Sequence, residues 1–98
     1  MLSLHIMILT FKHKGLEVFF LSGRVTGIQA IHQKRLRDLL TALNAASDPS
    51  DLGRPSWRIH KLAGNLSGFY AVTVQANWRL TFRFVENDVE LLDYLDYH

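Results

Sequence analysis

Near its C-terminal end the chain reads Trp78-Arg79-Leu80-Thr81-Phe82-Arg83-Phe84-Val85, and this stretch decides the fold. Bulky apolar side chains occupy positions 78, 80, 82 and 84, whereas Arg79, Thr81 and Arg83 occupy the positions between them. Alternation with a period of two is typical of a β-strand that has one buried face and one wet face. The sequence therefore predicts a strand over residues 78–85 whose two arginines point away from the core.

Further strands are predicted around this one. Apolar and polar residues alternate, at least roughly, in three other short segments of the C-terminal half. The predicted strands span residues 57–62, 69–74 and 89–93, and the predicted turns span residues 63–68, 75–77 and 86–88. Because these turns are short and rich in Gly, Asn or Asp, neighbouring strands are expected to form an antiparallel meander.

The N-terminal half favours helices. Residues 6–11 form an apolar run that predicts a first strand, and residues 13–21 predict a short helix closed by Ser22-Gly23. A longer helix is predicted to follow Thr26 and to run to residue 46, with Thr26 and Gln29 as a capping box. Its expected apolar stripe consists of Ile28, Ile31, Leu36, Leu39, Leu40, Leu43 and Ala46. The sum is an α+β fold with both helices packed on one face of the sheet.

Composition places the chain among ordinary globular proteins. It has 98 residues, of which 48% are hydrophobic and 20% are charged, so we expect one domain over 1–98, with residues 1–6 as a candidate N-terminal extension. No apolar run approaches the roughly 18 residues of a membrane span, and the N-terminus lacks the basic region of a signal peptide. There is no cysteine, which is compatible with the cytoplasm and excludes a disulfide framework.

Charge is distributed unevenly along the chain. The formal net charge is only +2, yet residues 52–85 contain no Asp or Glu. The basic residues of that stretch are Arg54, Arg58, Lys61, Arg79 and Arg83, and acidic residues return from Glu86 onward. A basic stretch built from strand-like sequence indicates a polyanionic partner such as RNA.

Strand alternation also predicts which of these residues share a face. If Trp57 and Ile59 face the core, Arg58 and His60 lie on the same wet face as Arg79 and Arg83. Cleavage of RNA through its own 2′-hydroxyl needs a base, an acid and a fixed cation for the phosphoryl oxygens. Histidine suits both proton-transfer roles, and arginine grips two phosphate oxygens at once.

Single residues carry less weight than their combination. His60, Arg79, Tyr97 and His98 together meet these requirements, whereas each alone is typical of a solvated strand or a chain end. His5, His13 and His32 have no partners at ligand spacing, and without cysteine the sequence predicts no metal site and no cofactor.

Four blocks of residues resemble one known family. They are residues 11–17 (F-K-H-K-G-L-E), residues 57–62 (W-R-I-H-K-L) with Gly64, residues 77–82 (N-W-R-L-T-F) and residues 93–98 (D-Y-L-D-Y-H). In content and order they are similar to the HigB-like toxins, a plasmid-maintenance killer group in the RelE/ParE superfamily. The resemblance runs from about Met7 to His98.

This resemblance implies a RelE-like fold and a small bacterial toxin that a neighbouring helix-turn-helix antitoxin neutralises. The implied activity is metal-independent cleavage of mRNA held on the ribosome, which inhibits translation in the cytoplasm. By motif, the implied catalytic residues are His60, Arg79, Tyr97 and His98, in proton-transfer roles that stay open between the two histidines. Asp96 matches the acid of the terminal motif as a supporting residue. Arg58, Lys61 and Arg83 are expected to attract RNA generally.

One position departs from the family pattern and keeps other functions open. The family often has a lysine immediately before the glycine of the second block, where this chain has Ala63 before Gly64. Lys61 does not replace that cation, because strand alternation directs it away from His60. The alternatives are a non-enzymatic toxin of the same fold that inhibits DNA gyrase, as ParE-type toxins do, and a basic domain that binds RNA without cutting it.

Overall fold

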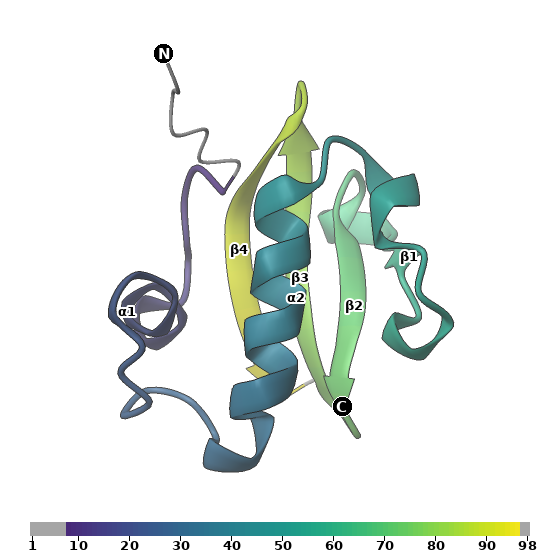
Figure 1. Cartoon of the computed structure of the whole chain (residues 1–98). Helices are drawn as coiled ribbons and strands as arrows, with labels where there is room; N and C mark the ends of the chain where they lie inside the picture. Colours follow the sequence, from purple (N-terminus) through teal and green to yellow (C-terminus); the bar gives the residue numbers. More distant parts are fainter. Residues whose placement is uncertain (1–7, 97–98) are drawn as a thin grey trace.

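A computed structural model describes residues 8–96 of the chain. Two helices and a four-stranded antiparallel sheet of order β1-β2-β3-β4 form an α+β fold, as predicted. The helices are α1 (Lys14–Ser22) and α2 (Gln33–Ala45), and the strands are β1 (His60–Lys61), β2 (Tyr70–Gln75), β3 (Trp78–Val85) and β4 (Asp88–Asp96). Helix α2 lies across one face of the sheet, and α1 lies beside β4 (Figure 1).

Strand β3 is the centre of the sheet and has the predicted bounds. It pairs with β2 on one side and with β4 on the other, so that Thr81 lies between Ala71 and Asp93. Strand β4 continues to Asp96, three residues beyond its predicted end, because its last residues pair with the start of β3. Asp96 itself pairs with Trp78. The C-terminal end of β4 therefore lies at the same end of the sheet as the β2–β3 hairpin.

The core fills the space between α2 and the sheet. Helix α2 contributes Leu36, Leu39, Leu40 and Leu43, which are all buried. The facing side of the sheet contributes Val72, Leu80, Phe82, Leu92 and Tyr94. Both sets follow from sequence periodicity, with a spacing of three or four on the helix and of two on the central strands. Within residues 8–96, no α-helix covers the opposite face of the sheet (Figure 1).

The start of the long helix differs from the prediction. Helix α2 begins at Gln33, after a short 3-10 turn over Ala30–His32, and Thr26 forms no capping box. Tertiary contacts explain the difference, since the Gln29 backbone N–H donates to the Tyr94 hydroxyl at 3.2 Å. Gly27 also contacts Gly15 of α1 so closely that a Cβ at Gly15 would lie 2.6 Å from the Gly27 carbonyl oxygen. The connection thus docks on α1 rather than extending α2.

This shift changes the environment of the residues that were expected to start the apolar stripe. Ile31 is 76% exposed instead of buried, and Ile28 is only partly buried against the core. The stripe is correct from Leu36 onward.

The N-terminal strand is less regular than predicted. Ile8 and Phe11 form isolated parallel bridges with β4, to Val89 and Leu92, and residues 6–7 of the predicted strand lie outside the described residues. Helix α1 follows nearly as expected. The side chain of His13 caps its N-terminus by accepting the Leu16 N–H at 2.9 Å, and Gly23 ends it at a φ of 81°.

The segment predicted as a strand over 57–62 is a strand only at His60 and Lys61. Residues Pro55–Trp57 form a 3-10 turn, and Arg58 follows it in the left-handed region at a φ of 50°. This conformation interrupts the alternation, because a strand needs extended backbone at every residue. Trp57 is nevertheless buried and Ile59 half-buried, so both pack on the core as expected.

Candidate active site

The face of the sheet opposite α2 carries the polar side chains. In the register of the sheet, Ala71 of β2 pairs with His60 on one side and with Thr81 on the other. Arg79 lies two residues from Thr81 on β3 and therefore shares this face. The Cα atoms of His60 and Arg79 are roughly 12 Å apart. This distance follows from two spacings between neighbouring strands and a shift of two residues along the strand. An imidazole and a guanidinium at this spacing can both contact one nucleotide between them.

His60 is held through one ring nitrogen. Its Nδ1 lies 3.1 Å from the carbonyl oxygen of Arg58, and its side chain is exposed on the short edge strand β1. A carbonyl oxygen only accepts hydrogen bonds, so Nδ1 carries the proton in the neutral ring and Nε2 is left as an acceptor. The left-handed conformation of Arg58 turns this carbonyl toward the histidine two residues later. The result is an exposed imidazole whose Nε2 can accept a proton.

Arg79 is held at the β2–β3 hairpin. Its Nη1 donates to the carbonyl oxygens of Ala76 and Trp78, at 2.5 and 3.1 Å. The side chain is half-buried, and its neighbours across the sheet are Thr73 and Leu95. Because Nη1 is used by the protein, the edge formed by Nε and Nη2 is the part of the guanidinium that remains for a ligand. That edge is a bidentate fork of the kind that binds phosphate.

A buried polar cluster supports this hairpin from the core side. His32 is buried, and its Nε2 and Nδ1 lie 2.9 Å from Gln75 Oε1 and 2.7 Å from the Tyr94 hydroxyl. The amide oxygen accepts from Nε2–H, so Nδ1 accepts from the Tyr94 hydroxyl. Burial raises the pKa of Tyr94, which keeps the hydroxyl protonated as this donor. Gln75 leads directly into Ala76, whose carbonyl holds Arg79.

A basic pocket of about 480 Å³ adjoins Arg79. Its lining residues are Arg35, Ser56, Arg58, Thr73, Val74, Gln75, Ala76 and Arg79. Three of these are arginines, and no lining residue in the described part of the chain is acidic. Arg58 therefore joins Arg79 on this surface, as predicted, although it does so from a loop instead of a strand. Sequence patterns gave no signal for Arg35, Ser56 or Thr73, because their proximity depends on the tertiary fold.

Two predicted RNA-binding residues lie apart from this arrangement. Lys61 pairs with Tyr70 and is exposed on the side opposite His60. Arg83 shares the outer face, but its Nε lies 2.5 Å from Glu90 Oε2 and its guanidinium lies over the ring of Phe69. The carboxylate neutralises most of the field that Arg83 would offer to a polyanion.

The remaining predicted residues lie at the edges of the described chain. Asp96 is exposed and ends β4 next to Trp78, while Tyr97 and His98 lie outside the described residues. Ala63 is exposed in extended backbone at a φ of −126°, immediately before Gly64 at a φ of 65°. A longer side chain at position 63 would meet no backbone strain.

Two other kinds of feature, a metal-binding cluster and a membrane-spanning helix, are absent from residues 8–96. That part of the chain contains no group of three or more His, Asp or Glu side chains that could hold a metal ion. Neither does any helix formed by these residues have the length and apolar character needed to cross a membrane.

Comparison with known proteins places this geometry in a family. Residues 9–98 match the sequence model of the RelE-like toxin of type II toxin-antitoxin system HigB. The chain is 41% identical to the Endoribonuclease HigB of Proteus vulgaris, over 94% of this chain and 100% of that protein. It is 38% identical to Toxin HigB-1 of Vibrio cholerae, over 94% of this chain and 98% of that protein.

Solved structures show the same fold at low sequence identity. YafQ from Escherichia coli superposes with a TM-score of 0.61 and 15% identity, over 89% of this chain and 88% of YafQ. The YoeB dimer from Staphylococcus aureus gives a TM-score of 0.58 and 20% identity, over 97% of this chain and 99% of the YoeB chain. The family match covers nearly the whole chain, and the names of both relatives contain HigB. This chain therefore belongs to the HigB-like toxins, the RelE-like toxins of type II toxin-antitoxin systems.

Proposed function

We propose that this HigB-like toxin is a metal-independent endoribonuclease that cleaves mRNA on the ribosome and so inhibits translation in the cytoplasm. The observation that carries the proposal is the joint placement of His60 and Arg79 on the open face of the sheet, each fixed by backbone carbonyls. The 41% identity to the Endoribonuclease HigB of Proteus vulgaris supports the same activity. A cognate helix-turn-helix antitoxin is the expected neutralising partner.

The tautomer of His60 supports its role as the general base. Its Nε2 takes the proton of the RNA 2′-hydroxyl, and the 2′-oxygen then attacks the adjacent phosphorus. The bond from phosphorus to the 5′-oxygen breaks as the new bond forms. A second group protonates the departing 5′-oxygen, and we assign this role to His98. The products are a 2′,3′-cyclic phosphate and a free 5′-hydroxyl.

Arg79 supplies the fixed positive charge of this reaction. Its Nε and Nη2 edge hydrogen-bonds the non-bridging phosphoryl oxygens, whose negative charge grows toward the transition state. Because Ala76 and Trp78 already hold Nη1, little side-chain reorganisation is needed when the substrate binds. Preorganised donors of this kind supply the largest part of many enzymatic rate enhancements.

The chain end completes the proposed site. Tyr97 and His98 follow Asp96 directly, and Asp96 pairs with Trp78 in the register beside Arg79. We assign Tyr97 to stacking on a base of the message and Asp96 to supporting its neighbours.

The test compares macromolecular synthesis after the toxin is induced in growing cells. The proposal predicts transcripts cut within translated codons, together with intact DNA. Intact messages together with DNA damage would identify the toxin as a gyrase inhibitor. Intact messages on ribosomes saturated with the purified protein would identify it as an RNA-binding domain that does not cut.

A further inference from the structure

The basic pocket beside Arg79 is placed where the sheet has an open edge. Strand β1 pairs only with Tyr70 and Ala71 of β2, so no described strand covers this edge of β2 from Val72 to Gln75. The loop that contains Ser56 and Arg58 lies across the gap and forms the far wall of the pocket. His60 does not line the pocket, although its Nδ1 contacts the Arg58 carbonyl oxygen.

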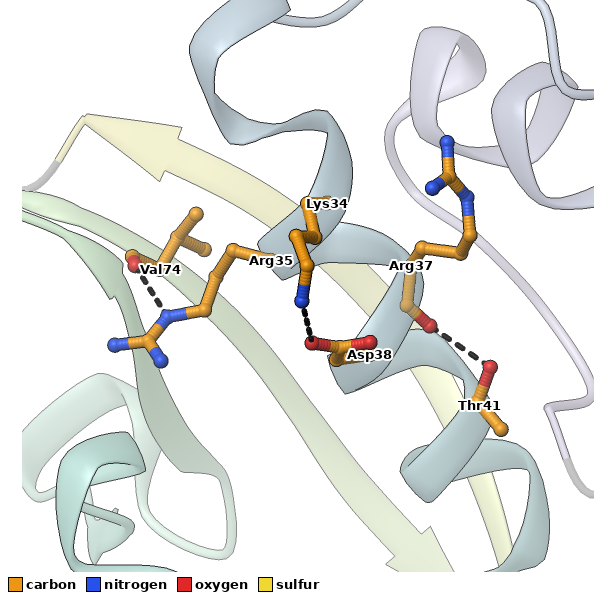
Figure 2. A network of polar contacts seen from close by, with 6 residues as sticks. All are labelled: Lys34, Arg35, Arg37, Asp38, Thr41 and Val74. Carbon is orange, nitrogen blue, oxygen red and sulfur yellow. Dashed lines mark hydrogen bonds and ion pairs between the residues drawn. The ribbon is translucent and has the colours of Figure 1, made fainter.

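Arg35 is fixed within this pocket by backbone carbonyl oxygens. Its Nε donates to Val74 at 2.8 Å, and its Nη2 donates to Ser56 at 3.3 Å. Figure 2 shows Arg35 reaching from α2 to Val74, while Arg37 projects from the other side of the helix. Arg35 is half-buried and bridges α2, β2 and the Ser56 loop. Its Nη1 group has no hydrogen-bond partner in the described part of the chain and remains for a ligand.

The charges of the pocket are arranged for an anion. Arg35, Arg58 and Arg79 come from three different elements, and no acidic side chain among the described lining residues offsets them. Two other cations of the described residues differ in this respect, since Lys34 pairs with Asp38 and Arg83 pairs with Glu90. Gathering three like charges around one hollow costs free energy in the unliganded protein. An anion in the pocket removes that cost.

Backbone strain occurs at the same place. Arg58 holds a φ of 50°, a conformation that is uncommon for residues with a Cβ and that Glu86 and Leu91 also adopt outside the pocket. Thr73, the cross-strand neighbour of Arg79, is a lining residue of the pocket, and its buried hydroxyl oxygen has no hydrogen-bond partner within residues 8–96. Both features are unfavourable locally and are retained beside the three arginines.

We propose that this pocket binds a backbone phosphate of the RNA that neighbours the scissile phosphate, with Arg35 as its anchoring residue. The inference rests on the proposed endoribonuclease function. His60 lies outside the pocket, and Arg79 lies on its wall. A phosphate held by Arg35 and Arg58 is thus displaced from His60, while the next phosphate along the chain reaches Arg79 and His60 together. The pocket sets the register of the message on the toxin.

The experiment measures binding of a short single-stranded RNA with 2′-O-methyl groups at every position, which cannot be cleaved through the 2′-oxygen. Fluorescence anisotropy gives its affinity for the intact protein over a range of low salt concentrations. Arg35→Gln is expected to lower the affinity about ten-fold, through the loss of one charge-assisted contact. The slope of log affinity against log salt is expected to fall by about 0.7, which corresponds to one lost phosphate contact on a single strand.

Arg37→Gln is the matched control, because it removes the same charge from the same helix outside the pocket. We expect its affinity and salt slope to stay close to those of the unchanged protein. Equal effects of Arg35→Gln and Arg37→Gln would overturn the proposal, since they would show a response to net charge alone. An unchanged protein that does not bind this RNA at low salt would overturn it as well.

A second variant guards against a folding artefact, since Arg35 also ties α2 to the sheet edge. Arg58→Asn removes a pocket charge without touching the bonds of Arg35, and asparagine accepts the left-handed backbone at this position. We expect the slope of its log affinity against log salt to fall by the same amount, while its melting temperature stays unchanged. An unchanged slope in this variant would count against the pocket even if Arg35→Gln were unfolded.

Failure of this proposal is distinguishable from failure of the proposed function. If the unchanged toxin cuts mRNA on ribosomes while the Arg35 and Arg58 variants bind the methylated RNA normally, the pocket assignment is wrong and the nuclease stands. If those variants lose affinity and slope while the unchanged toxin cuts nothing, the pocket binds RNA and the nuclease assignment is wrong.

Discussion

The replacement Arg79→Gln measures how much the fixed guanidinium contributes to cleavage. The two carbonyl oxygens that hold Nη1 leave the Nε and Nη2 edge for the phosphoryl group. Two charge-assisted hydrogen bonds from that edge contribute about 3 to 4 kcal/mol in the transition state. We therefore expect the cleavage rate to fall by roughly 10²- to 10³-fold, the range found when one preorganised donor is removed.

Arg79→Lys separates the charge from the fork. Lysine keeps the positive charge but lacks two parallel donors, so we expect a loss of about ten-fold, between the unchanged protein and Arg79→Gln. The assay is single-turnover cleavage of a defined message on purified translating ribosomes, at saturating toxin. Saturation makes the measured rate report the chemical step and not the affinity for the ribosome.

Arg83→Gln is the control on the same strand and the same face. Glu90 already pairs with Arg83, so removing this arginine is expected to change the rate by no more than about three-fold. Thermal melting of all three variants shows whether the fold is retained. If Arg79→Gln cleaves within about three-fold of the unchanged protein, or if Arg83→Gln is equally damaging, the assignment of the phosphate-binding fork to Arg79 is wrong.

Three further predictions concern position 63, the buried hydroxyl and the contact between α1 and the connection to α2. Ala63→Lys restores the cation that the family often has at this exposed, unstrained position. The rate of single-turnover cleavage should therefore rise by up to about ten-fold. An unchanged rate would show that this chain does not use that charge. Tyr94 has a pKa raised by burial above its usual 10.0, so its contribution to stability is present below pH 10.0 and is lost as the pH rises beyond it. The urea concentration at the midpoint of unfolding should fall less steeply with rising pH in Tyr94→Phe than in the unchanged protein. Parallel curves for the two proteins would contradict the raised pKa of Tyr94. Gly15→Ala places a Cβ 2.6 Å from the Gly27 carbonyl oxygen. It should lower the free energy of unfolding in urea by about 1 to 3 kcal/mol, although alanine has the higher intrinsic helix propensity. A variant more stable than the unchanged protein would contradict the close contact.

Local pattern was sufficient where packing on one face decides the structure. The alternation of residues 78–85 predicted β3 with the correct bounds, because alternate residues of this strand such as Leu80 and Phe82 pack in the core. It failed where a tertiary contact competes with local preference. Gly27 docks on Gly15, and Tyr94 takes the Gln29 N–H that Thr26 was expected to bind. Neither contact has a signature within a window of neighbouring residues.

The candidate site shows the same division. The alternation that placed Arg79 on the open face was correct, and His60 shares that face even though its strand is only two residues long. Arg58 lies at the site in a left-handed backbone conformation that the alternation did not predict. Arg35 was missed because its role depends on where β1 ends and leaves the edge of β2 open. Charge spacing alone also could not show that Glu90 neutralises Arg83.

The most direct test of the central claim is the chemical end left on a message by the unchanged toxin and by His60→Gln. We expect the unchanged toxin to produce fragments ending in a 2′,3′-cyclic phosphate on translating ribosomes. We expect His60→Gln, with an unaltered melting temperature, to produce almost none of these fragments, because glutamine cannot take the 2′-hydroxyl proton. Fragments formed equally well by both proteins, or an intact message with the unchanged toxin, would contradict cleavage by His60.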